Sequence, residues 1–126
     1  MRSGMLRAVG AATAVYGFAV AARPAVLARP AGLVTPDGGV AEDTRLALLP
    51  LGWRDAASGL AMVVAPDGAA LRTAALLRIA ADLGDAVLLG RRLRTTSRRY
   101  VTIAVSVGWA TLSVAALVAP ERPPAD

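Results

Sequence analysis

An adjacent arginine and aspartate, Arg54 and Asp55, lie halfway along an apolar stretch that is long enough to cross a membrane. A charged side chain at the centre of such a helix costs about 2.5 to 3.5 kcal/mol on an insertion scale. A second apolar stretch carries Arg78, Asp82 and Asp85, and their spacings of four and three place them on one face of a helix. Each stretch needs a neighbour that compensates its charges, and we expect each to be the other's neighbour.

Four apolar runs organise the 126-residue chain, which we interpret as a single integral membrane domain, residues 1–126. The runs cover approximately residues 5–22, 46–65, 71–89 and 101–119. Since a helix of about 20 residues spans the hydrocarbon core of a bilayer, the predicted fold class is all-α, a four-helix transmembrane bundle. The first run also fits a cleaved signal peptide, because it begins with basic residues and ends with small ones.

The composition narrows the chemistry that is open to the chain. Hydrophobic residues make up 56% of it, and cysteine and histidine are both absent. Disulfides, thiolate catalysis, the usual zinc and haem ligands and the usual general base are therefore excluded. We expect no cofactor, no metal site and no catalytic residue, and we interpret the protein as not an enzyme.

Two connections between the runs have distinct signatures. Residues 23–39 contain Pro24, Pro30 and Pro36, and this density of proline predicts an irregular connector without regular helix. Residues 65–68 read Ala-Pro-Asp-Gly, a tight-turn sequence. The second and third runs should therefore be antiparallel neighbours.

The depth of each charged residue in the membrane, counted along the helix from the centre of its run, predicts which charges meet. In an antiparallel pair, Arg54 lies level with Asp82, and Asp55 lies within side-chain reach of Arg78. We therefore predict an Arg54–Asp82 pair with an Asp55–Arg78 companion. Asp85 is then a surplus acid that pairs with an arginine of the next loop, is protonated, or forms a site for a proton or cation.

A stripe of small residues lies on the same run as Arg54. Gly52, Ala56 and Gly59 follow one another at spacings of four and three. Small residues at this spacing allow the backbones of two membrane helices to approach closely. We expect the stripe to pack against a neighbouring helix.

A basic loop between the third and fourth runs sets the expected orientation. Lys and Arg are enriched in cytoplasmic loops, so this loop should be cytoplasmic and should contact anionic lipid headgroups. With four spans, the proline-rich connector lies on the same side and both termini lie outside the cell membrane. The five arginines of the loop are Arg91, Arg92, Arg94, Arg98 and Arg99.

The net charge of +5 does not indicate a nucleic-acid partner. All fourteen basic residues are arginine, and five of them fall in this single loop beside an apolar run, without an accompanying aromatic platform. The expected partner is the lipid bilayer, together with a second copy of the chain or another membrane subunit.

Two motifs carry a resemblance to a known class of proteins. The pattern Gly52-x-Arg54-Asp55-x-x-x-Gly59, followed by Arg78-x-x-x-Asp82-x-x-Asp85-Ala86, resembles small four-span bacterial integral membrane proteins of unknown function. The resemblance covers roughly residues 7–119. It implies a compact four-helix membrane bundle and no particular activity.

These observations lead to two hypotheses on function. The first is a non-enzymatic, multi-pass protein of the cell (inner) membrane that acts as a subunit or interaction module, with a buried Arg/Asp network. The alternative is a small proton- or ion-coupled transporter that uses the intramembrane carboxylates, because ionisable residues inside a membrane are often functional.

Overall fold

A computed structural model describes residues 1–92 and 96–120 of the chain. Within these ranges the structure is all-helical, as predicted. Its five helices are α1 (Ser3–Ala22), α2 (Ala25–Ala31), α3 (Glu42–Val64), α4 (Ala69–Arg92) and α5 (Thr96–Val118). The four long helices correspond to the four apolar runs, and each extends beyond the predicted limits at one end or both.

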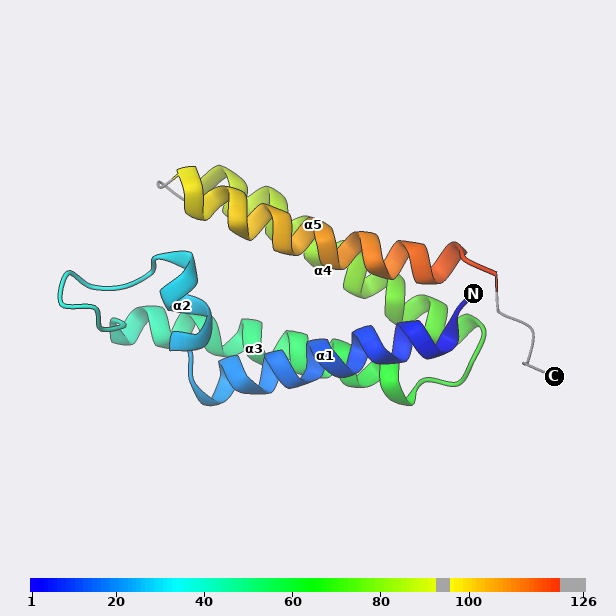
Figure 1. Cartoon of the computed structure of the whole chain (residues 1–126). Coiled ribbons are helices and arrows are strands. Elements are labelled where there is room, and N and C mark those ends of the chain that lie inside the picture. The colour runs from blue at the N-terminus through cyan, green and yellow to red at the C-terminus, as the bar shows by residue number, and fades with distance from the viewer. Residues whose placement is uncertain (93–95, 121–126) are drawn as a thin grey trace.

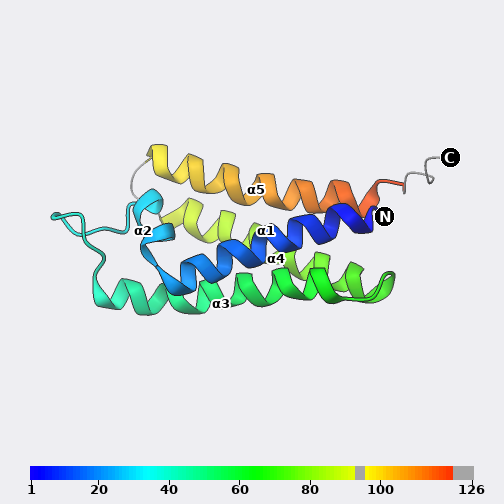
Figure 2. The same cartoon turned by 60° about the horizontal axis from the view of Figure 1, so that its bottom comes forward.

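The four long helices form two close pairs (Figures 1 and 2). Helix α3 packs mainly against α1, and α4 packs mainly against α5. Helices α3 and α4 are antiparallel and joined by the predicted turn, where Gly68 has a φ of 97°. They nevertheless contact each other far less than either contacts its main partner.

The bundle has two ends that differ in sequence (Figure 1). The connector end carries residues 23–41, which include helix α2, together with the end of α4 and the start of α5. The turn end carries the start of α1, the turn at residues 65–68 and the end of α5. The α1 start is tied to the α5 end by a hydrogen bond from the Arg2 amide to the Ala116 carbonyl, at 2.8 Å.

Helix α2 corrects the prediction that the proline-rich connector lacks regular helix. Pro24 precedes the first turn, where a missing N–H breaks no intrahelical bond, and Pro30 falls in the last turn. The helix then closes with a Schellman motif at Gly32, whose φ is 73°. The Gly32 and Leu33 amides donate to the Arg29 and Ala28 carbonyls.

An apolar cluster joins all four long helices at the turn end. Leu6 and Val9 of α1 meet Met62 of α3, Leu71 and Ala75 of α4, and Ala116 of α5. Most of these side chains are completely buried. Arg7 closes the same end, since its guanidinium donates to the Val63 and Ala65 carbonyls and forms an ion pair with Asp67 at 2.9 Å.

The outer surface between the two ends is apolar. Leu77 and Val105 are exposed by 66% and 62%, and many other large hydrophobic side chains point outward in the same way. By length and composition, α1 and the Tyr100–Val118 part of α5 are apolar enough to cross a membrane. Helices α3 and α4 fail this test, and they are the helices that carry the central charges.

Candidate functional site

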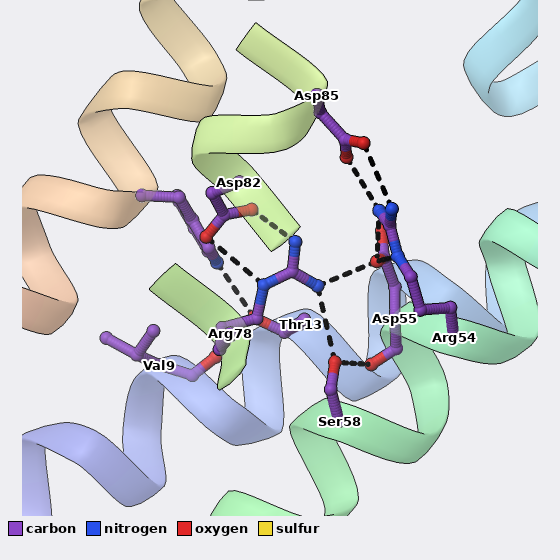
Figure 3. A network of polar contacts seen from close by, with 9 residues as sticks. Val9, Thr13, Arg54, Asp55, Ser58, Arg78, Asp82 and Asp85 are labelled. Atoms are coloured by element: carbon purple, nitrogen blue, oxygen red, sulfur yellow. Dashed lines mark hydrogen bonds and ion pairs between the residues drawn. The ribbon is translucent and has the colours of Figure 1, made fainter. Parts of the chain in front are cut away.

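Five charged side chains from α3 and α4 meet in one cluster, which we call the charge network: Arg54, Asp55, Arg78, Asp82 and Asp85 (Figure 3). The sequence predicted ion pairs among the first four of these residues and left Asp85 as a surplus acid. All five lie midway along α3 and α4, far from both ends of the bundle. Two guanidinium groups face three carboxylates, so the charge network has an excess of one negative charge when all five groups are ionised.

Arg78 is the centre of the charge network and its most buried member, with 2% of its side chain exposed. Its Nε and one terminal nitrogen donate to both oxygens of Asp82, one turn further along α4. Its other terminal nitrogen donates to Asp55 Oδ1 at 2.7 Å and to Ser58 Oγ at 3.3 Å. Arg78 therefore links α4 to α3.

Arg54 occupies the more open side of the charge network. Its two terminal nitrogens donate to the two oxygens of Asp85 at 3.0 and 2.6 Å, a bidentate arrangement. Its Nε and one terminal nitrogen also donate to Asp55 Oδ1 at 3.1 and 2.9 Å. The Arg54 side chain is 34% exposed and that of Asp85 is 23% exposed.

The Asp55–Arg78 contact agrees with the depth argument, but the predicted Arg54–Asp82 pair is wrong. Asp82 lies four residues after Arg78 on the same helix, a spacing that brings two side chains together, and it binds that arginine. Arg54 instead reaches Asp85, which is therefore not a surplus acid. The acid shared between the two guanidinium groups is Asp55, whose Oδ1 accepts from both.

The predicted small-residue stripe faces α1. A Cβ atom added at Gly52 would lie 2.7 Å from the Ala21 amide nitrogen, and one added at Gly59 would lie 2.5 Å from the Gly10 carbonyl oxygen. Both distances are too short for real carbon contacts. Ala56 is also buried on this face and contacts Gly17. The two helices can approach this closely because neither has a side chain larger than alanine at these positions.

Only the α3 side of this contact between α1 and α3 was predicted from the sequence. Helix α1 contributes its own small stripe, formed by Gly10, Ala14, Gly17 and Ala21. The signal was present, since Gly10 and Gly17 are separated by the same seven positions as Gly52 and Gly59. Matched heptad spacing of glycines in two apolar runs indicates which runs pack together.

A polar contact next to the charge network joins the two helix pairs. The Trp109 indole nitrogen of α5 donates to Thr13 Oγ1 of α1 at 2.8 Å, and this hydroxyl donates to the Val9 carbonyl. Trp53, by contrast, is 59% exposed on α3 and packs edge-to-face on Phe18. Among the described residues, the buried Ser113 hydroxyl of α5 has no hydrogen-bond partner.

The predicted headgroup-contacting arginines are only partly described. Arg91 lies at the connector end and is exposed. Arg94 and the side chains of Arg92, Arg98 and Arg99 lie outside the described residues. Within residues 1–92 and 96–120, no group of three or more acidic residues is arranged to hold a metal ion.

Comparison of the chain with models of known protein families, with curated proteins and with solved structures gave no match. The site is therefore defined by its own geometry: five charged side chains, joined by hydrogen bonds, at the centre of an apolar bundle.

Proposed function

We propose that the protein is a non-enzymatic integral membrane protein with four spans, α1, α3, α4 and α5, and that it acts as a subunit or interaction module. The observation that carries this proposal is the inverted distribution of polarity. Midway along the bundle, charged side chains point inward to one another, whereas leucine and valine side chains point outward. Lipid accepts an apolar outer surface, and intramembrane charges face the bundle interior and pair there.

The energy of insertion explains why α3 and α4 fail as single spans. Three central charges on α4 cost roughly 8 kcal/mol on the insertion scale, and its aliphatic side chains return only about half of that. In the charge network, each arginine is bound to carboxylates of both helices. The pair α3–α4 thus removes a cost that neither helix can remove alone.

The distribution of arginine supports an orientation with the connector end in the cytoplasm. Arg23, Arg29, Arg45 and Arg91 lie at this end of the bundle, and the sequence has four more arginines between residues 92 and 99. The turn end has fewer arginines. The positive-inside rule then places the connector end inside and both termini outside.

An interaction role requires a surface that the fold leaves open. The stripe at Gly52, Ala56 and Gly59 is already covered by α1, so a second copy or another subunit would pack on the outer faces of the helices. The exposed Phe18–Trp53 pair on α1 and α3 belongs to such a face. The charge network, whose five members bind one another, would then hold the two helix pairs together so that this face keeps its shape.

One observation favours a second candidate function, a proton- or ion-coupled carrier. The charge network has one more carboxylate than guanidinium groups, and its Arg54–Asp85 side is partly exposed. An excess carboxylate in an apolar setting can hold a proton or a cation. Asp85→Asn separates the two candidates, since a carrier loses transport in a folded protein, whereas a structural network loses stability only.

Accessibility of single cysteines tests the four-span arrangement, because the chain contains no cysteine of its own. Asp37→Cys marks the connector end, Ala69→Cys the turn end and Leu77→Cys the apolar outer surface. All three positions are exposed. In intact cells, a membrane-impermeant maleimide should label only Ala69→Cys, and after permeabilisation it should label Asp37→Cys as well.

The variant Leu77→Cys is the decisive control. If lipid covers the outer surface, this thiol stays unlabelled by the water-soluble reagent under both conditions, although it is exposed in the structure. Labelling of Leu77→Cys at the rate of the other two would refute a membrane-spanning bundle. Labelling of Asp37→Cys alone in intact cells would refute only the orientation.

A further inference from the structure

A hollow at the connector end lies apart from the charge network. It has a volume of about 260 Å³ and is formed by residues from the end of α1, from α2, from the connector and from the start of α3. We call it the arginine hollow; its lining residues are Ala22, Arg23, Pro24, Ala25, Arg29, Gly38, Gly39, Val40 and Arg45. Ligand pockets usually measure about 300–1,000 Å³, so this volume suits a small group such as a lipid headgroup.

The lining of the arginine hollow is strongly basic. Arg23 follows the last residue of α1, Arg29 lies in the last turn of α2, and Arg45 lies in the first turns of α3. No carboxylate is among the nine lining residues. The acidic residues of this end, Asp37, Glu42 and Asp43, are exposed and lie outside the lining.

Three arginines from three separate segments require an explanation beyond orientation in the membrane. The positive-inside effect depends on how many basic residues a loop contains, so arginines spread along the connector would serve it equally well. Here the fold of α2 and the return of the connector to α3 bring them around one hollow. Arginine binds phosphate through its planar, bidentate donor group and is the residue that recurs at phosphate sites.

The other walls of the arginine hollow are apolar. Ala22, Pro24, Ala25 and Val40 line it together with the arginines. A second hollow, of about 370 Å³, shares Arg23, Ala25 and Arg29 and extends along α2 to Val26 and Pro30. This combination of basic and apolar walls, directly beyond the ends of two long helices, matches the boundary between lipid headgroups and acyl chains.

We propose that the arginine hollow binds the phosphate group of an anionic phospholipid headgroup. The inference that this phosphate belongs to a lipid rests on the proposed membrane-spanning function. The inference that the hollow recognises phosphate rests on the arginines alone. A basic pocket at the cytoplasmic ends of membrane helices is a known setting for anionic headgroups. Bound lipid would join α1, α2 and α3 at the end of the bundle that lies away from the apolar cluster.

Binding to three small probes tests this proposal in detergent micelles. The probes are dioctanoyl phosphatidylglycerol, dioctanoyl phosphatidylcholine and glycerol 3-phosphate, and the readouts are native mass spectrometry and the shift in melting temperature. The variant Arg23→Gln/Arg45→Gln removes two lining charges. The matched control, Arg2→Gln/Arg72→Gln, removes the same charge from two arginines at the turn end of the bundle, outside the hollow.

We expect one phosphatidylglycerol to bind the parent, with an affinity that falls about tenfold or more in Arg23→Gln/Arg45→Gln and less than about twofold in the control. Equal binding of phosphatidylcholine, or an equal loss in both double variants, would overturn the proposal. Binding of glycerol 3-phosphate as tight as that of phosphatidylglycerol would support phosphate recognition and overturn the lipid as its source. Failure of the membrane arrangement would instead be detected by labelling of Leu77→Cys.

Discussion

Removal of the Arg78 guanidinium should destabilise the bundle more than any other single change in the charge network. In Arg78→Met, Asp82 loses the arginine that binds both of its carboxylate oxygens, and its side chain is just 7% exposed. Asp55 loses one partner but keeps Arg54. Breaking a buried ion pair from one side costs about 3 to 5 kcal/mol, because the remaining charge is buried without compensation.

The double variant Arg78→Met/Asp82→Leu removes both members of this pair. The remaining residues, Arg54, Asp55 and Asp85, keep their mutual ion pairs and the same excess of one negative charge. Replacing a buried pair with apolar side chains is often close to neutral, so we expect the double variant to lie within about 2 kcal/mol of the parent. The assay is a titration with SDS in dodecyl maltoside micelles, followed by circular dichroism and tryptophan fluorescence.

A second double-mutant cycle, on Arg54 and Asp82, is the matched control. These residues share no hydrogen bond in the structure, although depth in the sequence predicts that they pair. We expect the coupling energy of the Arg78–Asp82 cycle to exceed that of the Arg54–Asp82 cycle by at least about 2 kcal/mol. A larger coupling in the control cycle, or an Arg78→Met variant within about 1 kcal/mol of the parent, would refute the structural role assigned to Arg78.

Two further predictions use the same titration, and a third uses limited proteolysis. Gly17→Ala should cost about 1–3 kcal/mol, because the added methyl group meets the backbone of α3, whereas Gly84→Ala, which meets nothing within 4 Å, should be neutral or stabilising. Trp109→Phe should cost about 0.5–1.5 kcal/mol through its lost hydrogen bond to α1, and Ser113→Ala on the same helix should cost less, since its hydroxyl has no partner in the described part of the chain. Arg7→Lys keeps the charge but loses the forked contact with two carbonyls and Asp67, so proteolysis at the 65–68 turn should become faster.

The helices and the five members of the charge network could be predicted because they follow from local signals. Apolar runs of about 20 residues specify long helices, and charges at the centres of two such runs require each other. The small-residue stripe was also visible, since its spacing is local. These features do not depend on the three-dimensional arrangement of the helices.

The pairing inside the charge network could not be predicted from depth alone. Depth fixes the height of each Cα atom in the bundle, but a guanidinium group reaches several ångströms along a helix, and two acids compete for Arg54. The contact between Arg78 and Asp82, one turn apart on one helix, settles that competition. Ser58, which also accepts from Arg78, carried no signal of its own.

Helix ends and helix partners were the other source of error. The sequence predicts that the third run ends at residue 89, but α4 continues through Gly90 to Arg92, and a Cβ atom at Gly90 would lie 2.9 Å from Ile103 Cδ1 of α5. Glycine here serves close packing between helices. In the same way, α3 packs against α1 because the small-residue faces of the two helices fit each other. Such a fit cannot be read from either helix alone.

The internal ion pairs of each helix bear on how the chain is made. Arg54 and Asp55 form an ion pair at 2.9 Å within α3, and Arg78 forms an ion pair with Asp82 within α4. Asp55 and Arg78 are 23 positions apart, which corresponds to a delay of about 1–5 s at a synthesis rate of roughly 5–20 residues per second. During that delay α3 carries its own counter-ion. When α4 leaves the ribosome, α3 already holds Arg54 in a position to bind Asp85. The cation of this ion pair is therefore synthesised before its acid.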